Sequence, residues 1–270
     1  MTRIASSPFS IRVQSTPSQS TGLDFPSNSD SPAGAFVAFR FLNPQSNGLP
    51  IWGPGSAGAT YIWKILPRQQ SGYYTTFFWG NNGAFTAAYY GAHPYPDPPP
   101  DGSSHNWEIS VNTLDVQDTR GGSPKVVANG VWHTQALRVI YNGDNTKTLI
   151  YYLALPSVAD ANVIEYIAPD HYGESGDLPP SPALTFGDAP WSQGNERLSG
   201  VLRGIKIFNR LLSEADMLSE AASDALVTPA GQANIWWKKI NPTPDDLLCE
   251  AGTGRNPQWA QSTKASLWTG

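Results

Sequence analysis

The chain has 270 residues, of which 40% are hydrophobic and 11% aromatic, enough for a sizeable core. Only 14% are charged, against about 25% in typical soluble domains, and the net charge of -5 comes without any basic run. These values exclude a basic surface for nucleic acid, a membrane span of roughly 18 apolar residues and, with Cys249 as the one cysteine, an internal disulfide framework or a cysteine-rich zinc site.

Residues 1–33 are rich in Ser, Pro and Thr, with one alternating run at Phe9–Val13. This composition is typical of an extended N-terminal arm that is ordered only against a neighbour, or of a disordered leader. The segment carries none of the apolar core of a secretory signal. We therefore expect a protein that is made and folded in a reducing cytoplasm.

Residues 34–228 carry the predicted globular domain. Short runs of β-branched and aromatic residues, bounded by Gly, Pro, Asn or Asp, predict strands. The predicted strands are Phe36–Phe41, Tyr61–Ile65, Tyr73–Trp79, Phe85–Tyr90, Trp107–Val111, Trp132–Tyr141, Thr148–Leu155, Leu184–Phe186 and Val201–Phe208. So many short strands favour an all-β sandwich or barrel.

Two local signals refine this outline. Asn142-Gly143-Asp144-Asn145 joins two of the clearest strands and predicts a hairpin turn, because Asn and Gly tolerate positive φ. Ser213–Ala222 predicts one short helix, with Ser213 as its N-cap and acids in its first turn. One helix after many strands favours a sandwich over an α/β enzyme.

Residues 229–270 form a Trp-rich C-terminal extension. It holds four of the ten Trp residues, Trp236, Trp237, Trp259 and Trp268, with little periodicity. Trp side chains are seldom left in water. We expect this extension to pack on the domain or on a neighbouring subunit.

Two stretches of the domain resemble the laminin-G-like branch of the concanavalin A-like lectins and glucanases. The stretch Gly130-Val131-Trp132-His133 through Ala136-Leu137 to Gly143 is similar to that family's strand and turn. The second stretch runs from Leu184-Thr185-Phe186-Gly187 through Leu198-Ser199-Gly200 and Gly204-Ile205-Lys206-Ile207-Phe208-Asn209-Arg210 to Asp216, and it is similar to the family's late strands and short helix. The resemblance implies a two-sheet antiparallel jelly roll with glycan or protein ligands on a concave face or loop rim. It supplies no catalytic residues.

Catalytic chemistry finds little support in the residue pattern. Retaining glycosidases need two carboxyl groups about 5–5.5 Å apart, and on one strand only alternate residues share a face. Glu108 stands alone on its predicted strand, and Asp115, seven positions on, is expected past the strand end. His133 is expected to be structural. We predict no catalytic residues, no metal ligands and no cofactor, although Asp97–Asp101 and Glu174–Asp177 leave calcium open.

An aromatic and polar belt between Tyr73 and Trp107 is the candidate binding surface. Sugar rings stack on aromatic faces, and Asn or His side chains bind hydroxyls. The predicted carbohydrate-binding residues are Trp79, Asn81, Asn82, Tyr90, His93, Tyr95 and Trp107. The alternative is that these aromatics belong to the core or to a subunit interface.

These features together predict a non-enzymatic virion structural protein, such as a decoration, fibre or tail component, that acts in assembly or in host attachment. The expected partners are other virion subunits of an oligomeric assembly and surface glycans, without nucleic acid or membrane insertion. A glycan-degrading enzyme on the same scaffold, or a bacterial cell-surface adhesin module, are the alternatives.

Overall fold

The structure is a computed structural model. It describes residues 22–25, 39–42, 58–68, 73–80, 85–90, 104–111, 114–116, 125–128, 130–144, 146–155, 163–169, 183–187, 198–208, 210–223, 227, 235–237, 258–259 and 266–268.

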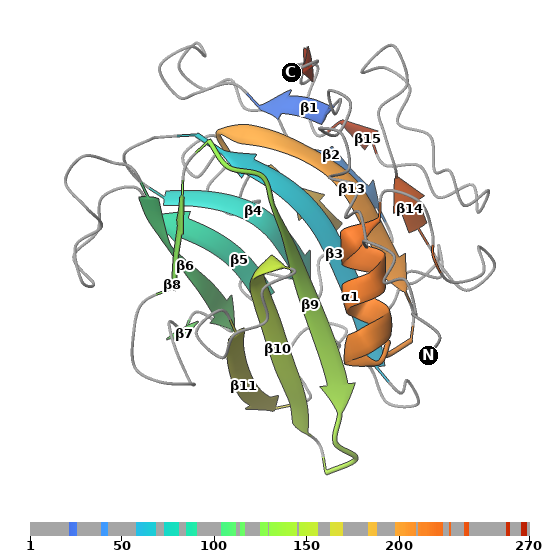
Figure 1. The fold of residues 1–270 in the computed structure, drawn as a ribbon. Helices are drawn as coiled ribbons and strands as arrows, with labels where there is room; N and C mark the ends of the chain where they lie inside the picture. Colours follow the sequence, from blue (N-terminus) through green and yellow to red (C-terminus); the bar gives the residue numbers. More distant parts are fainter. Residues whose placement is uncertain are drawn as a thin grey trace, which may run out of the picture.

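Two antiparallel sheets make up the described part of the chain (Figure 1). Sheet A runs in the order β11 (Val163–Pro169), β10 (Thr146–Leu155), β9 (His133–Tyr141), β3 (Gly58–Pro67), β13 (Gly200–Phe208), β1 (Gly22–Phe25) and β16 (Ser266–Trp268), and β14 (Ile235–Trp237) also pairs with β13. Sheet B runs β15 (Gln258–Trp259), β2 (Phe39–Leu42), β12 (Ala183–Phe186), β4 (Tyr73–Gly80), β5 (Phe85–Tyr90), β6 (Ser104–Val111) and β7 (Leu114–Val116), and β8 (Lys125–Ala128) also pairs with β6. The predicted antiparallel two-sheet fold is confirmed.

The main core lies between the sheets and follows from strand alternation. On β3, Tyr61, Trp63 and Ile65 are at most 1% exposed and point to the same side. The Trp63 ring meets the ring of Phe186, on β12 of sheet B, edge to face at 6.3 Å between centroids. Because these two rings come from different sheets, they fix which face of each sheet is internal.

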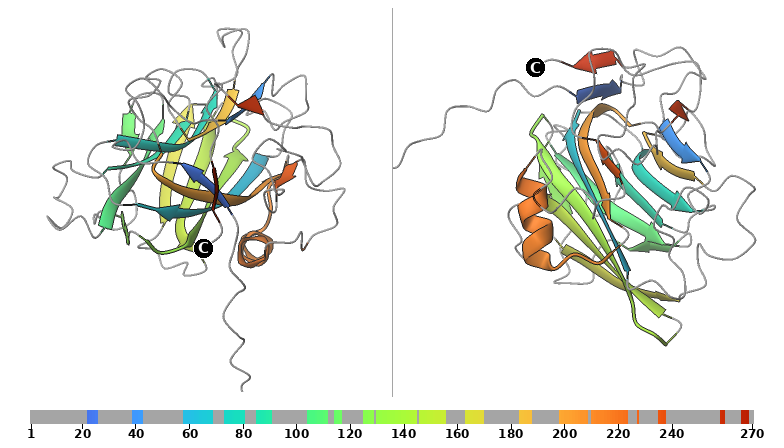
Figure 2. Two further views of the ribbon diagram at one scale, coloured as in Figure 1. Left: turned by 90° about the horizontal axis from the view of Figure 1, so that it is seen from above. Right: turned by 90° about the vertical axis from the view of Figure 1, so that its right-hand side faces the viewer.

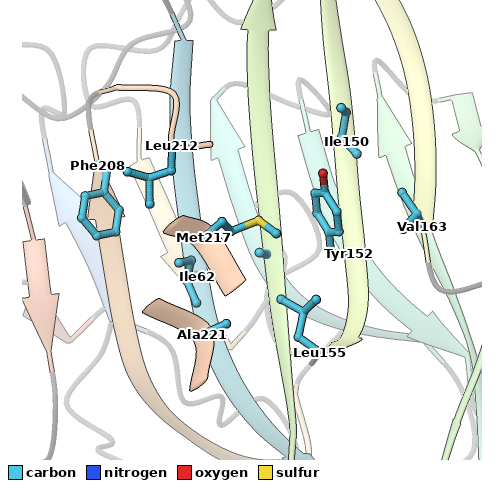
Figure 3. Packing of buried hydrophobic residues seen from close by; sticks show 10 residues of the cluster. Ile62, Ile150, Tyr152, Leu155, Val163, Phe208, Leu212, Met217 and Ala221 are labelled. Carbon is cyan, nitrogen blue, oxygen red and sulfur yellow. The ribbon is translucent and has the colours of Figure 1, made fainter. Parts of the chain in front are cut away.

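The helix α1 (Glu214–Ala222) covers the other face of sheet A, so the described elements form three layers: helix, sheet A and sheet B (Figure 2, right). Met217 and Ala221 of α1 are buried against this face (Figure 3). The partners come from β3, β9, β10, β11 and β13 and the chain before α1: Ile62, Ala136, Ile150, Tyr152, Leu155, Val163, Phe208 and Leu212. Sheet A is therefore covered on both faces, which explains the long buried pattern of β3.

Hydrogen bonds hold both ends of α1 to sheet A. Before the helix, Thr60 accepts a bond from the Leu212 N–H at 3.0 Å, and Arg138 Nε donates to the Leu212 carbonyl at 3.2 Å. After it, Lys206 Nζ donates to the Glu220 carboxylate at 2.7 Å, the Glu220 carbonyl at 2.8 Å and the Ser223 carbonyl at 3.0 Å. A buried lysine thus satisfies the carbonyl groups at the helix C-terminus.

The predicted N-cap is confirmed and gives a direct stability test. The Asp216 N–H donates to Ser213 Oγ at 3.1 Å, and the hydroxyl donates in turn to the Asp216 carboxylate at 2.7 Å. Replacing Ser213 by Ala should lower the free energy of unfolding by about 1 kcal/mol, because the amide loses its acceptor. Urea unfolding measures this change, with Ser219→Ala, at an exposed position of the same helix, as the control. Equal stability of the two variants would contradict the cap.

The predicted hairpin is also confirmed. β9 and β10 pair through Tyr141 and Lys147, and the Asn142 N–H donates to the Thr146 carbonyl at 3.1 Å. Gly143 has φ 78°, a left-handed conformation that glycine adopts readily.

Both predicted terminal segments contribute strands. Within residues 1–33, β1 pairs with β13 and is held by the Arg68–Asp24 ion pair and by the fully buried Phe25. Within residues 229–270, β14 pairs with β13, β15 with β2, and β16 with β1. The two termini of the described chain are therefore neighbours at one edge of sheet A. The predicted contacts of these segments with other subunits stay predictions.

Candidate functional site

Sheet B contains the described part of the predicted binding belt, and its register assigns each position to a face. Residues directly opposite on antiparallel strands share a face, and successive residues alternate. Phe186 lies on the inner face because its ring meets Trp63. The row of partners through Phe186 is apolar on every strand: Trp259, Phe39, Phe186, Phe77, Ala87, Ile109 and Val116.

The neighbouring row lies on the outer face, away from sheet A, and differs completely in chemistry. We call it the outer row; it comprises Gln258, Arg40, Thr185, Phe78, Thr86, Ser110 and Asp115, one residue from each of seven strands. Six of these seven residues are polar, and Phe78 is the aromatic at the centre. Sheet B thus has an apolar row of positions on the face toward sheet A and a mostly polar row on the outer face.

The register separates the predicted carbohydrate-binding residues. Trp79 pairs with Leu184, two positions before Phe186, and so takes the inner face. Trp107 pairs with Tyr89, two positions from Ala87, and takes the inner face as well. Tyr90 takes the outer face, about 13 Å along β5 from Thr86. Asn81, Asn82, His93 and Tyr95 lie outside the described residues.

Two carboxylates come closer than the sequence spacing indicated. Asp115 lies past the end of the Glu108 strand, as expected, but it belongs to β7 and lies directly opposite Ser110 of β6. Glu108 is two positions from Ser110, so Glu108 and Asp115 are diagonal neighbours on the outer face. Diagonal neighbours are about 7–8 Å apart, with their Cβ atoms somewhat closer. The two carboxylates become neighbours because β7 pairs antiparallel with β6, which spacing along one strand cannot reveal.

Outer-face residues missed by sequence reasoning could be found only through the strand register. Arg40, Thr185 and Ser110 are separated by many residues in sequence and belong to β2, β12 and β6. Alternation alone does not divide the aromatics of β4 correctly, because a register shift between Thr75 and Phe77 puts Tyr73 and Phe77 on opposite faces, and it does not say which face meets the other sheet. The Phe186–Trp63 contact supplies that missing information.

A buried polar network crosses the inner face of sheet A. The Oε1 atom of Gln135 accepts hydrogen bonds from Trp63 Nε1 at 2.8 Å and from the Tyr151 hydroxyl at 2.9 Å. Gln135 Nε2 must therefore donate to His133 Nε2, at 3.1 Å. His133 carries its proton on Nδ1, which lies 3.3 Å from the Val131 carbonyl. The imidazole is neutral in one tautomer, a structural role in line with expectation.

This network makes a pH dependence of stability expected. Burial lowers the pKa of His133 from 6.5 to about 4, against a smaller opposing effect of the hydrogen bond to Val131. The unfolded chain therefore binds more protons between pH 6.5 and 4. The contribution of neutral His133 is complete above pH 6.5 and is lost as the pH falls toward 4, up to about 3 kcal/mol.

Urea unfolding at several pH values tests this expectation, with His133→Leu as the matched variant. The wild-type free energy of unfolding should fall between pH 6.5 and 4 more steeply than that of His133→Leu. Parallel pH profiles for the two proteins would show that His133 does not cause the dependence.

Two negative findings apply only within the described part of the chain. Among those residues, no helix is long and apolar enough to cross a membrane. The same residues contain no group of three or more His, Cys, Asp or Glu side chains arranged to hold a metal ion.

The sequence matches no protein-family model and no curated protein. In three dimensions the chain is similar to a putative carbohydrate binding protein from Bacteroides ovatus, with a TM-score of 0.54, 12% identity, and coverage of 94% of this chain and 60% of that one. It is also similar to a SAP-like pentraxin from Limulus polyphemus (TM-score 0.43, 15% identity, 78% of this chain and 85% of that one). A third is the tailspike protein 2 of an Escherichia coli O157:H7 bacteriophage (TM-score 0.41, 11% identity, 82% and 30%).

The register and the first of these likenesses define the class of fold. The protein is an antiparallel two-sheet jelly-roll sandwich, and the described residues include one short helix, packed on the outside of sheet A. The jelly-roll part of the sequence resemblance is confirmed, and membership of the laminin-G-like branch stays a prediction.

Proposed function

We propose that the protein is a non-enzymatic, glycan-binding subunit of a virus particle and that it binds glycan on the outer face of sheet B. The observation that carries glycan binding is the division of sheet B into an apolar inner row and a hydroxyl-rich outer row around Phe78. Thr, Ser, Gln and Arg side chains exchange hydrogen bonds with sugar hydroxyls, and an aromatic residue offers a stacking surface. The Bacteroides ovatus protein, described as a putative carbohydrate binding protein, supports this by its fold.

The proposed site contains only some of the binding residues that were predicted from the sequence. Tyr90 stays in it, because it lies on the outer face, and Phe78 and Tyr73 join it, since Phe78 pairs with Thr86 and Tyr73 with Tyr90. Trp79 and Trp107 are assigned to the core between the sheets. The two sets of aromatics should therefore respond differently to substitution.

A glycan array followed by titration calorimetry tests this assignment. Phe78→Ala and Tyr90→Ala should weaken binding of the best array ligand by roughly tenfold each, as truncation of an aromatic anchor does, without loss of stability. Trp79→Ala should lower stability by about 3–5 kcal/mol and leave the affinity of the folded protein unchanged. Ile167→Ala, at an exposed position on β11 of sheet A, is the control. Loss of binding in Trp79→Ala but not in Phe78→Ala would overturn the assignment.

The assignment to a virus particle rests on the sequence features of the terminal segments. A Ser/Pro-rich arm and a Trp-rich extension suit a subunit that is tied into an assembly. Mass spectrometry and immunogold labelling of particles from cells that carry the gene test it. Labelled particles support the proposal, whereas label confined to the cell surface favours the adhesin alternative.

A glycan-degrading enzyme is the second candidate, and one observation favours it. Glu108 and Asp115 are diagonal neighbours, about 7–8 Å apart with their Cβ atoms somewhat closer, and this spacing is comparable to the carboxyl separation of inverting glycosidases, roughly 6.5–9.5 Å. If this pair is catalytic, array ligands incubated with the protein release new reducing ends, and Glu108→Gln and Asp115→Asn each abolish the release. An unchanged ligand after prolonged incubation supports binding alone.

A further inference from the structure

The outer row carries opposite charges at its two ends. Arg40 lies near one end, on β2, beside Gln258 of β15. Asp115 lies at the opposite end, on β7, and Glu108 is its diagonal neighbour on β6. Hydroxyl residues and one aromatic occupy the strands between: Thr185, Phe78, Thr86 and Ser110. The face therefore changes from cationic to anionic across the sheet.

The length of the row indicates the shape of a ligand that would use it. Neighbouring strands lie about 4.8 Å apart, so seven strands span roughly 29 Å. One sugar ring covers little more than one strand spacing. A terminal monosaccharide could contact Phe78 and its two Thr neighbours, but it would leave Arg40 and Ser110 without ligand groups. A ligand that engages the whole row must be an extended chain that runs across the strands.

The charge order indicates where a negative group belongs. A guanidinium binds a carboxylate through two parallel hydrogen bonds, and this pairing is stronger than hydrogen bonding to a neutral hydroxyl. At the other end of the row, Glu108 and Asp115 would repel a ligand carboxylate but could accept hydrogen bonds from the hydroxyl groups of a neutral sugar. Sugar acids are the carbohydrates that carry such a group.

We infer that the ligand is a linear acidic polysaccharide that crosses the strands of sheet B, with a sugar carboxylate over β2 at Arg40 and neutral hydroxyls over β6 and β7. This inference rests on the proposed glycan-binding function and specifies the substrate class of that site. It is carried by the juxtaposition of Arg40, Thr185, Phe78, Thr86, Ser110 and Asp115 in one register row.

Size-graded oligosaccharides from hyaluronan, alginate and polygalacturonate, each with its carboxyl-reduced counterpart, test the inference together with a general glycan array. Affinity for an acidic series should rise with chain length until the oligosaccharide spans the row. Carboxyl reduction of the best ligand should weaken binding by roughly tenfold, the effect of losing a hydrogen bond to a charged group.

Three variants locate the two ends of the ligand. Arg40→Ala should weaken binding of the acidic ligand roughly tenfold and leave binding of its carboxyl-reduced form unchanged, while Arg40→Lys should restore part of the loss. Ser110→Ala should weaken binding of long oligosaccharides but not of short ones. Ser219→Ala, on the exposed surface of α1, is the matched control for a lost hydroxyl.

The outcomes separate this inference from the proposed function. Array ligands that are neutral, or that bind equally well as monosaccharides, overturn the acidic extended chain and leave glycan binding intact. If the protein binds no ligand on the glycan array and none of the acidic oligosaccharides, the proposed glycan-binding function is overturned as well.

Discussion

Replacing Lys206 by Met should destabilise the protein by about 3–5 kcal/mol, a large part of the 5–15 kcal/mol typical of a whole domain. Lys206 and Glu220 are 1% and 0% exposed, and their charged groups are 2.7 Å apart. Without the ammonium group, the Glu220 carboxylate is left buried without its counter-charge. The carbonyls of Glu220 and Ser223 lose a donor at the same time.

Chemical denaturation measures this loss, and the double variant Lys206→Met with Glu220→Met is its control. Replacing both charges by apolar groups removes the buried unpaired carboxylate, so the double variant should regain much of the stability. The recovery is incomplete because Glu220 Oε1 also accepts a hydrogen bond from the Val227 N–H at 3.0 Å. A Lys206→Met protein as stable as the wild type would contradict this account of how α1 is fastened.

Replacing Gln135 by Leu should cost about 3 kcal/mol or more. One side chain serves Trp63, Tyr151 and His133 inside the sandwich, and Leu of similar volume can neither accept nor donate. Each buried polar group that loses such a partner costs about 1–3 kcal/mol. Thermal unfolding and urea titration should both report the loss.

The control for Gln135→Leu removes one of the two donors to Gln135 Oε1 as well. Adding Tyr151→Phe to Gln135→Leu eliminates one of the groups that lost its acceptor, so the double variant should be more stable than Gln135→Leu alone. If Tyr151→Phe instead adds its full single-variant cost, the hydroxyl does not depend on Gln135, and the network is wrongly assigned.

The sequence predicted best what is encoded locally. α1 was predicted because Ser213, the early acids and the apolar positions of one helix turn lie within ten residues. The strands Tyr73–Trp79 and Phe85–Tyr90 were predicted from composition and boundaries, and β4 and β5 extend these bounds by at most one residue. Such features need no knowledge of the rest of the fold.

Short and edge strands were missed for a physical reason. β7, β8 and the three strands of the C-terminal extension have two to four residues each. Runs of that length carry too little periodicity to be recognised, and they form because a longer strand offers them hydrogen-bonding partners. β11 was missed although it has seven residues. Its apolar run is interrupted by Glu165 and ends at Pro169, so it lacks the continuous β-branched and aromatic pattern of the predicted strands.

Long-range pairing limited the prediction of the candidate site. Nothing local in Gly200–Phe208 shows that Lys206 is buried against Glu220, because its neighbours alternate as in an ordinary half-exposed strand. The same limit applies to sheet B, where the aromatic belt was visible but its division between two faces was not. Trp79 and Trp107 differ from Tyr90 only through the register with Phe186.

Hydroxyl-radical footprinting of the protein with and without its best array glycan tests the central claim most directly. If the outer face of sheet B binds glycan, Phe78 and Tyr90 lose labelling when the glycan is bound, while Phe77 and Trp79, on the inner face of the same β4 strand, keep theirs. Unchanged labelling of Phe78 and Tyr90 at saturating glycan, with protection elsewhere on the molecule, would contradict the account.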